Sequence, residues 1–208
     1  MRERILTKAK ELFFKFGLRS VSMDDICREL GISKKTLYQH FETKDKLIKE
    51  GMTKQMEEDV CMMKNAQANA FNAIDELLQL SEYVAAMLSE LSPTLLYDCQ
   101  KYHRPIWVEF EKINSEHIYN DIHRNLKRGI AEGLYRNDFD IDIITKLYLG
   151  LSNNSTNVDI FPPQKYNTKA VFQTHIMYHI RGIATPKGME VLHDLLEKQK
   201  ITTTNSSF

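Results

Sequence analysis

Residues 22–41 read SMDDICRELGISKKTLYQHF, and this stretch decides how the N-terminal part of the chain folds. Ser22 is a typical N-cap residue, and the acidic Asp25 three positions later completes a capping box, so a short helix begins here. Gly31 ends that helix, and Ser33 caps a second one directly after the turn. Two short helices joined by a tight turn that contains glycine predict a helix-turn-helix.

The second of these helices, residues 34–40, has almost no side chains suited to packing in a core. Only Leu37 and the following Phe41 have the character of core residues, so the remaining side chains face outward. Lys34 and Lys35 occupy the first turn, which is the turn that a recognition helix presents to the major groove. A solvated surface helix would have the same features, so the pattern alone leaves both interpretations open.

Working outward, the rest of the chain has the spacing of helices. Apolar residues recur every three or four positions, no alternating run is long enough for a sheet, and the 208 residues include only 8 glycines and 5 prolines. We therefore expect an all-α fold. The first helix should bury Ile5, Leu6, Ala9, Leu12, Phe13 and Phe16 and end at Gly17. Later helices are expected from about 44 into 52–63 and at 70–91, 94–102, 105–132, 140–153, 168–184 and 187–199, with one long loop at 153–167.

The charge is balanced overall but divided along the chain. Residues 1–50 hold 12 Lys and Arg against 8 Asp and Glu, a net charge of +4, which leaves −4 for the other 158 residues. A neutral total argues against indiscriminate coating of nucleic acid, whereas a basic head on an acidic body remains compatible with a specific contact. No apolar run reaches the roughly 18 residues of a membrane span, and the charged N-terminus is unlike a secretory signal. We expect a cytoplasmic protein whose three cysteines, Cys27, Cys61 and Cys99, are reduced core residues.

The run from Phe16 to Leu47 closely resembles the DNA-binding domain of the TetR family of repressors. The segments LGIS at 30–33, TLYQHF at 36–41 and TKDKL at 43–47 occur with the family's spacing, and the detailed match covers about residues 3–51. Cys27 departs from the pattern, where alanine is more usual, and a small buried thiol should fit there. The resemblance implies a sequence-specific DNA-binding regulator.

The resemblance also implies roles for individual residues. Tyr38, His40 and Lys44 match positions that hold the DNA backbone, and their donors suit phosphate oxygens. Ser22, Ser33 and Thr36 could donate hydroxyl hydrogen bonds there as well. Lys can reach guanine and Gln can pair with adenine, so the candidate base readers are Lys34, Lys35 and Gln39.

The remaining helices are expected to bind a ligand and a second subunit. The resemblance suggests an inducer site in the helical body, where the sequence is rich in aromatic residues; the candidate lining is Tyr83, Met87, Tyr102, Trp107 and Phe110. Such a lining favours an apolar or aromatic effector. We expect a DNA-binding domain at 1–50, a ligand-binding and dimerisation domain at 51–201 and a frayed tail at 202–208. The expected function is a ligand-released repressor that binds a pseudo-palindromic operator as a homodimer through helices 140–153 and 168–184.

Other signals are weak. His175 and His179 have a metal-compatible spacing but no identifiable third ligand, so packing between helices is favoured. Asp138, Asp140 and Asp142 begin like a calcium loop that lacks its glycine and its final glutamate. We expect neither a metal nor a cofactor, and no catalytic motif is present. The alternatives are a helical protein-interaction module without DNA binding and, less favoured, a helical enzyme.

Overall fold

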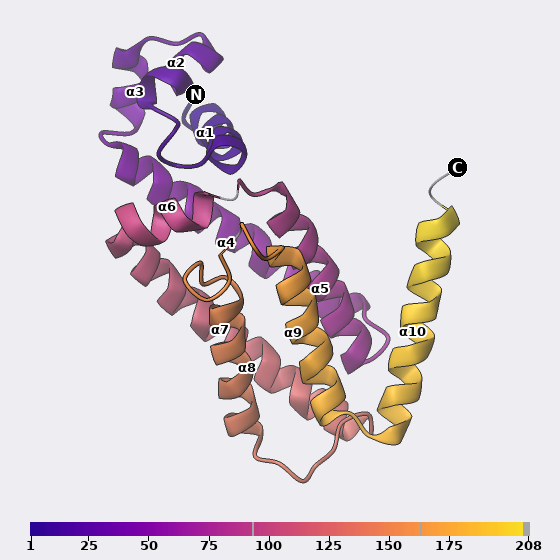
Figure 1. Cartoon of the computed structure of the whole chain (residues 1–208). Coiled ribbons are helices and arrows are strands. Elements are labelled where there is room, and N and C mark those ends of the chain that lie inside the picture. The colour runs from indigo at the N-terminus through magenta and orange to yellow at the C-terminus, as the bar shows by residue number, and fades with distance from the viewer. Residues whose placement is uncertain (93, 163, 206–208) are drawn as a thin grey trace.

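The computed structural model describes residues 1–92, 94–162 and 164–205, with side chains up to residue 198. In these ranges the chain forms ten α-helices and, apart from an isolated bridge between Tyr135 and Ala184, no β-structure. The predicted all-α fold is confirmed. The helices shown in Figure 1 are α1 (Arg2–Phe16), α2 (Met23–Leu30), α3 (Lys34–His40), α4 (Lys44–Asn69), α5 (Ala73–Glu90), α6 (Leu95–Tyr102), α7 (Arg104–Ala131), α8 (Ile141–Ser155), α9 (Thr168–Ile183) and α10 (Pro186–Asn205).

The helix-turn-helix forms through local capping. Ser22 Oγ accepts from the Asp25 backbone N–H at 3.2 Å while the Asp25 carboxylate accepts from the Ser22 N–H at 2.9 Å, which is the predicted capping box. Gly31 adopts a left-handed conformation with φ 64°, which an L side chain rarely adopts. This glycine ends α2 and turns the chain towards Ser33, the N-cap of α3.

Helices α1, α2, α3 and the first turns of α4 gather at one end of the molecule (Figure 1). Their shared core includes Ile5, Phe13, Ile26, Leu37 and Leu47. Two residues of α6, Leu95 and Cys99, are buried in the same core. Helix α4 continues from this head into the body, so residue 50, the expected domain boundary, lies inside a continuous helix.

The body packs α5, α7, α8, α9 and α10 around a second core that includes Ile74, Leu126, Tyr135 and Ile176. Helix α9 lies against α5 and α8, and α8 lies against α7. Within the described ranges, no helix combines the length and the hydrophobicity that crossing a membrane requires.

Three local predictions were wrong. Phe16 is exposed because it is the last residue of α1, and its ring lies beside Lys15. Cys61 is exposed because that part of α4 has solvent on one side, whereas Cys27 and Cys99 are buried as expected. Helix α10 continues to Asn205, past the expected end near 199, because no glycine or proline interrupts residues 199–205. The last residues of the expected tail, 206–208, lie outside the described residues.

Candidate nucleic-acid interface and internal cavity

Helix α3 presents an outward face of unpaired polar side chains. Leu37 is fully buried and anchors the helix, while Lys35, Tyr38 and Gln39 are exposed and His40 is half-buried. Among the described residues, these four polar side chains have no hydrogen-bond or ion-pair partner. A helix that offers free donors and acceptors on one face can contact a polar partner without first breaking internal bonds.

The hydroxyl candidates are engaged in capping. Ser22 Oγ contacts the Asp25 carboxylate at 2.6 Å in addition to its backbone bond. Ser33 Oγ accepts from the Thr36 backbone N–H at 3.1 Å and shares a second hydrogen bond with the Thr36 hydroxyl at 2.8 Å. Ser33 remains exposed, so a phosphate oxygen can approach the hydroxyl pair at the start of α3.

Two of the cationic candidates have internal partners. Lys34 Nζ lies 2.7 Å from the Asp24 carboxylate, which raises the pKa of Lys34 and links α3 to α2. Lys44 turns inward: its Nζ donates to the Leu18 carbonyl oxygen and lies 5.8 Å from the centre of the Phe13 ring. Burial lowers the pKa of Lys44. The Lys44 side chain therefore points into the head, where its ammonium group is hydrogen-bonded to the backbone of the loop after α1.

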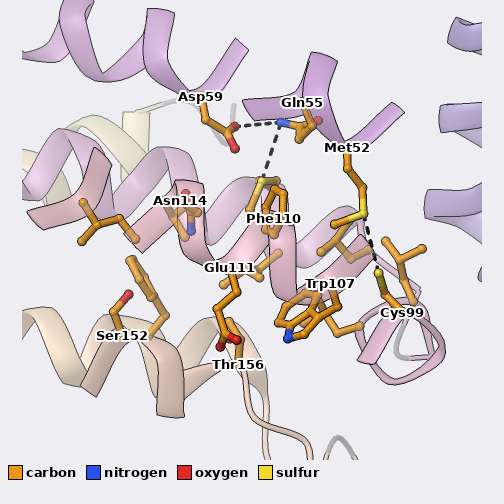
Figure 2. Close-up of a pocket in the computed structure, with 18 of the residues that line it drawn as sticks. Met52, Gln55, Asp59, Cys99, Trp107, Phe110, Glu111, Asn114, Ser152 and Thr156 are labelled. Carbon is orange, nitrogen blue, oxygen red and sulfur yellow. Dashed lines mark hydrogen bonds between the residues drawn. The ribbon is translucent and has the colours of Figure 1, made fainter. Parts of the chain in front are cut away.

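A cavity of about 230 Å³ lies between the head and the body helices. Its wall contains four of the five residues that the sequence indicated, namely Tyr83, Met87, Trp107 and Phe110. Figure 2 shows Trp107 and Phe110 on α7, with Met52 of α4 and Cys99 of α6 at one end of the cavity. The wall also includes head residues such as Phe13, Leu18 and Ile48, which the sequence did not indicate.

Tyr102 was predicted to line this cavity and does not. It is the last residue of α6, the residue is 45% exposed, and the Arg19 guanidinium lies 4.8 Å from the ring centre. Its hydroxyl accepts from Arg19 Nη1 at 3.2 Å. The end of α6 directs this ring towards the loop after α1, away from the body.

The cavity wall also contains polar groups that the sequence analysis did not predict there. Asp59 on α4 accepts from the Tyr83 hydroxyl at 2.6 Å. It also accepts from Gln55 Nε2 at 2.8 Å, a bond that Figure 2 shows. Burial raises the pKa of Asp59 despite these two donors, and burial together with the Asp59 hydrogen bond raises that of Tyr83. Glu111, one turn after Trp107, also lines the cavity. No sequence motif marks either carboxylate, because its place on the cavity wall depends on how α4 and α7 pack.

Helix α6 connects the cavity to the head. Asp98 is buried and accepts from the Arg19 backbone N–H at 2.9 Å, while its neighbours Leu95 and Cys99 belong both to the head core and to the cavity wall. Burial raises the pKa of the Cys99 thiol to about 12, so it acts as a small apolar residue. A second backbone link joins the Ser92 N–H to the Phe14 carbonyl oxygen at 2.6 Å.

The two histidines of α9 pack between helices, as the sequence favoured. The rings of His175 and His179 lie 4.6 and 4.8 Å from that of Tyr148 on α8. Both are buried, and three of their four ring nitrogens lack a hydrogen-bond partner in the described structure. No group of three or more potential metal ligands occurs among the described residues.

An apolar row remains uncovered on α8. Ile143, Leu147 and Leu151 follow one another at four-residue spacing and are 57%, 58% and 41% exposed. Tyr178 on the neighbouring α9 is exposed as well. Elsewhere on α8, Tyr148 is buried, and Ile141 and Ile144 are half-buried. The helix turns its partly apolar second face into the body core.

Known proteins resemble both the head and the whole chain. Residues 5–50 match the model described as "Bacterial regulatory proteins, tetR family". The uncharacterized HTH-type transcriptional regulator YvaF of Bacillus subtilis is 23% identical over 189 residues, covering 88% of this chain and 95% of its own. The HTH-type transcriptional regulator UidR of Escherichia coli is 49% identical over 47 residues, which are 23% of this chain and 24% of that protein.

The fold recurs in solved structures of regulators. A transcriptional regulator from Saccharomonospora viridis, solved in complex with choline, superposes with a TM-score of 0.65 at 20% sequence identity and covers 88% of this chain and 97% of its own. The matched residues 5–50 contain all three segments, LGIS, TLYQHF and TKDKL, on which the resemblance rested. Residues 5–50 therefore carry the DNA-binding domain of the TetR family of transcriptional regulators.

Proposed function

We propose that the chain is a repressor that binds a pseudo-palindromic operator as a homodimer and leaves it when a small molecule occupies the cavity. The observation that carries this proposal is the face of α3, where Lys35, Tyr38, Gln39 and His40 are unpaired among the described residues. In a TetR regulator these side chains meet DNA without competing internal contacts. Residues 1–50 form the DNA-binding unit and 51–201 the ligand-binding and dimerisation unit, with α4 shared between them.

The contacts divide into gripping and reading. Tyr38 and His40 lie at the end of α3 and can donate to phosphates, as can the hydroxyls of Ser22, Ser33 and Thr36. Gln39 and Lys35 project freely and can reach base edges. Lys34 forms an ion pair with Asp24, and Lys44 must break its hydrogen bond to the Leu18 carbonyl oxygen before it can contact a phosphate. Both lysines therefore contribute less to DNA affinity than unpaired lysines would.

Dimerisation is supported by the uncovered row on α8. Three large apolar side chains on one helix face, with Tyr178 beside them on α9, form a surface that a second copy can cover. A two-fold dimer presents its two heads to two half-sites of symmetric DNA. Figure 1 shows α8 and α9 in the body, away from the end of the molecule that carries α3, so that a second copy on α8 leaves α3 uncovered.

Release by a small molecule is supported by the position of the cavity. Its wall combines body residues such as Tyr83 and Trp107 with head residues such as Phe13 and Ile48. A ligand there contacts both parts and can favour one head position over another, to the extent that its affinity differs between them. A protein of the same fold has been solved with a bound small molecule, choline.

A gel-shift assay with the DNA that flanks the protein's own gene tests the proposal. The expected result is a discrete complex that survives excess random DNA and disappears for the Gln39→Ala variant at the same concentration. Binding equally to both DNAs would mean that α3 does not read sequence. No binding to any DNA would instead support a helical protein-interaction module.

A further inference from the structure

The charges around the cavity are unevenly distributed. Among the described residues of its wall, Asp59, Glu111 and Asp121 are acidic, whereas Lys10 is the sole basic residue. Lys10 Nζ is already paired with Glu58 outside the wall. Asp121 is paired with Arg124 Nη1 at 2.8 Å. Glu111 therefore faces the cavity without a cation from the described protein, and Asp59 is attracted by Lys10 but forms no ion pair with it.

Glu111 is the less satisfied of the two. It is half-buried on the face of α7 that lines the cavity, and within the described part of the chain it makes no hydrogen bond or ion pair. Figure 2 shows its side chain extending from α7 in the direction of Thr156. A partly desolvated carboxylate without a partner is costly, and a cation that enters the cavity recovers that cost.

Asp59 supplies a second carboxylate from α4, already oriented. Its two donors, Tyr83 and Gln55, hold it in place but bring no positive charge. Burial raises its pKa, because the lost hydration outweighs the two hydrogen bonds and the attraction of Lys10. An arriving positive charge favours the ionised form of this group.

The neighbouring surface is aromatic. The Trp107 and Phe110 ring centres lie 5.8 Å apart with their planes inclined at 37°. Trp107 and Glu111 are four residues apart on α7, so the indole and the carboxylate share one face of the helix. Aromatic faces attract cations, most strongly where water is excluded, and trimethylammonium groups suit such faces better than strongly hydrated ions do.

We propose that the cavity selects a small lipophilic cation, in which an ammonium group meets Glu111 and the aromatic faces of Trp107 and Phe110 while a hydrocarbon body fills the apolar remainder. Asp59 adds negative charge elsewhere on the same wall. This inference rests on the proposed function, because it names the chemical class of the effector at that site. An anionic ligand would meet the negative charges of Glu111 and Asp59. A bare metal ion would find too few oxygen ligands among Met, Leu and Phe side chains.

Two probes of the same shape separate charge from hydrophobicity. Benzyltrimethylammonium and neopentylbenzene differ only in a nitrogen that replaces a carbon, and the chain has one tryptophan, Trp107, in the cavity wall. Titrations without DNA, followed by Trp107 fluorescence, should show that the cation binds at least about tenfold more tightly than the neutral probe. Equal affinities, or no binding of either probe, would overturn the inference.

Variants then test which carboxylate is responsible for the preference for the cation. Glu111→Gln keeps the shape of the side chain and should weaken the cation about tenfold while leaving the neutral probe unaffected. Asp59→Asn should act in the same direction and provides a second variant should the first not fold. Glu116→Gln, an exposed position on α7 outside the cavity wall, removes the same charge and should change neither affinity.

Unchanged cation binding in both Glu111→Gln and Asp59→Asn would refute a cation site. Operator binding is measured separately, in gel shifts without probe. If the protein binds its operator but shows no preference for the cation, the effector class alone is wrong. If the gel shift fails, the proposed regulatory function is wrong, whatever the titrations show.

Discussion

Lys44 shows how the surroundings of a side chain change the meaning of its position. The family resemblance predicts that Lys44, at the start of α4, holds a phosphate, yet its ammonium group donates to the Leu18 carbonyl oxygen and lies over Phe13. The residue therefore stabilises the loop after α1. Any contact with DNA requires that this hydrogen bond be exchanged for a phosphate contact.

We expect Lys44→Ala to lower stability as well as DNA affinity. The change leaves the Leu18 carbonyl without its donor in a half-buried setting, a loss of about 1–3 kcal/mol. Thermal melting without DNA should show a lower midpoint for Lys44→Ala. Lys46→Ala is the control, because Lys46 pairs with Glu42 on the surface and its loss should have little effect. Equal midpoints for both variants would mean that the internal contact does not stabilise the head.

Gln39→Ala should change specificity without changing stability. Its side chain is exposed and has no partner in the described structure, so its removal leaves the fold intact. On the true operator the loss should be about 1–3 kcal/mol, with relaxed preference at one base pair per half-site and an unchanged salt dependence. Titration of operator and scrambled DNA at several salt concentrations measures this. Equal losses on both DNAs would make Gln39 a backbone contact.

Sequence reasoning at the residue scale succeeded where the partners are close in the chain. Ser22 and Asp25 form the predicted capping box, and Leu37 is buried because α3 has few other apolar side chains. It failed where the partners are distant. Tyr102 turns to Arg19, and Asp59 meets Tyr83, only because separate helices pack in one way. No local pattern encodes these pairs.

At the scale of elements, the predicted helices agree with the structure within a few residues, because glycine, proline and N-cap residues punctuate the chain. Asp140 caps α8 through the Ile143 N–H, and Asn167 caps α9 through the Ala170 N–H. The end of α10 was missed since nothing there breaks a helix. Which faces of α8 are covered could not be predicted either, as apolar residues occupy both sides of that helix.

The packing of α8 against α9 predicts a loss of stability in mild acid. Burial lowers the pKa of His175 and of His179 to about 4, from a usual value of 6.5. Between these values the unfolded chain binds protons that the folded protein excludes, so stability is full above pH 6.5 and falls as the pH drops towards 4. The loss should be on the order of 3 kcal/mol for each histidine.

Denaturant unfolding at a series of pH values measures this effect. Replacing both histidines with phenylalanine should flatten the pH dependence between about 4 and 6.5. His193→Phe is the control, because His193 is exposed on α10 and should leave the profile as it is. A double variant with the wild-type profile would show that other groups cause the acid sensitivity.

At the scale of the whole molecule, the uncovered row on α8 predicts the oligomeric state. Sedimentation at micromolar concentration should show a species of twice the 24.3 kDa chain mass without DNA. Leu147→Glu places a charge at the centre of the row and should produce the monomer. Phe71→Glu makes the same kind of change at a side chain that is 88% exposed elsewhere, and it should remain a dimer. A wild-type monomer would refute this interface.

Helix α6 is the element through which cavity and head can influence one another. Leu95 and Cys99 belong to the head core and to the cavity wall at once, and Asp98 between them holds the Arg19 backbone N–H. A displacement of α6 by a ligand therefore moves contacts on which the loop before α2 depends. The sequence could not reveal this link, since α6 and the head are separated by most of α4 and all of α5.

Such a link must act equally in both directions. If benzyltrimethylammonium lowers operator affinity by some factor, about 5–150-fold in typical allosteric proteins, saturating operator must lower the affinity for the probe by the same factor. Gel shifts with probe and Trp107 titrations with operator measure the two factors independently. Asp98→Asn keeps the side chain's shape but weakens its hold on Arg19, and it should reduce both factors together, whereas Glu116→Gln should change neither. A probe that binds in the cavity with an affinity indifferent to operator would show that cavity and head are not coupled through α6.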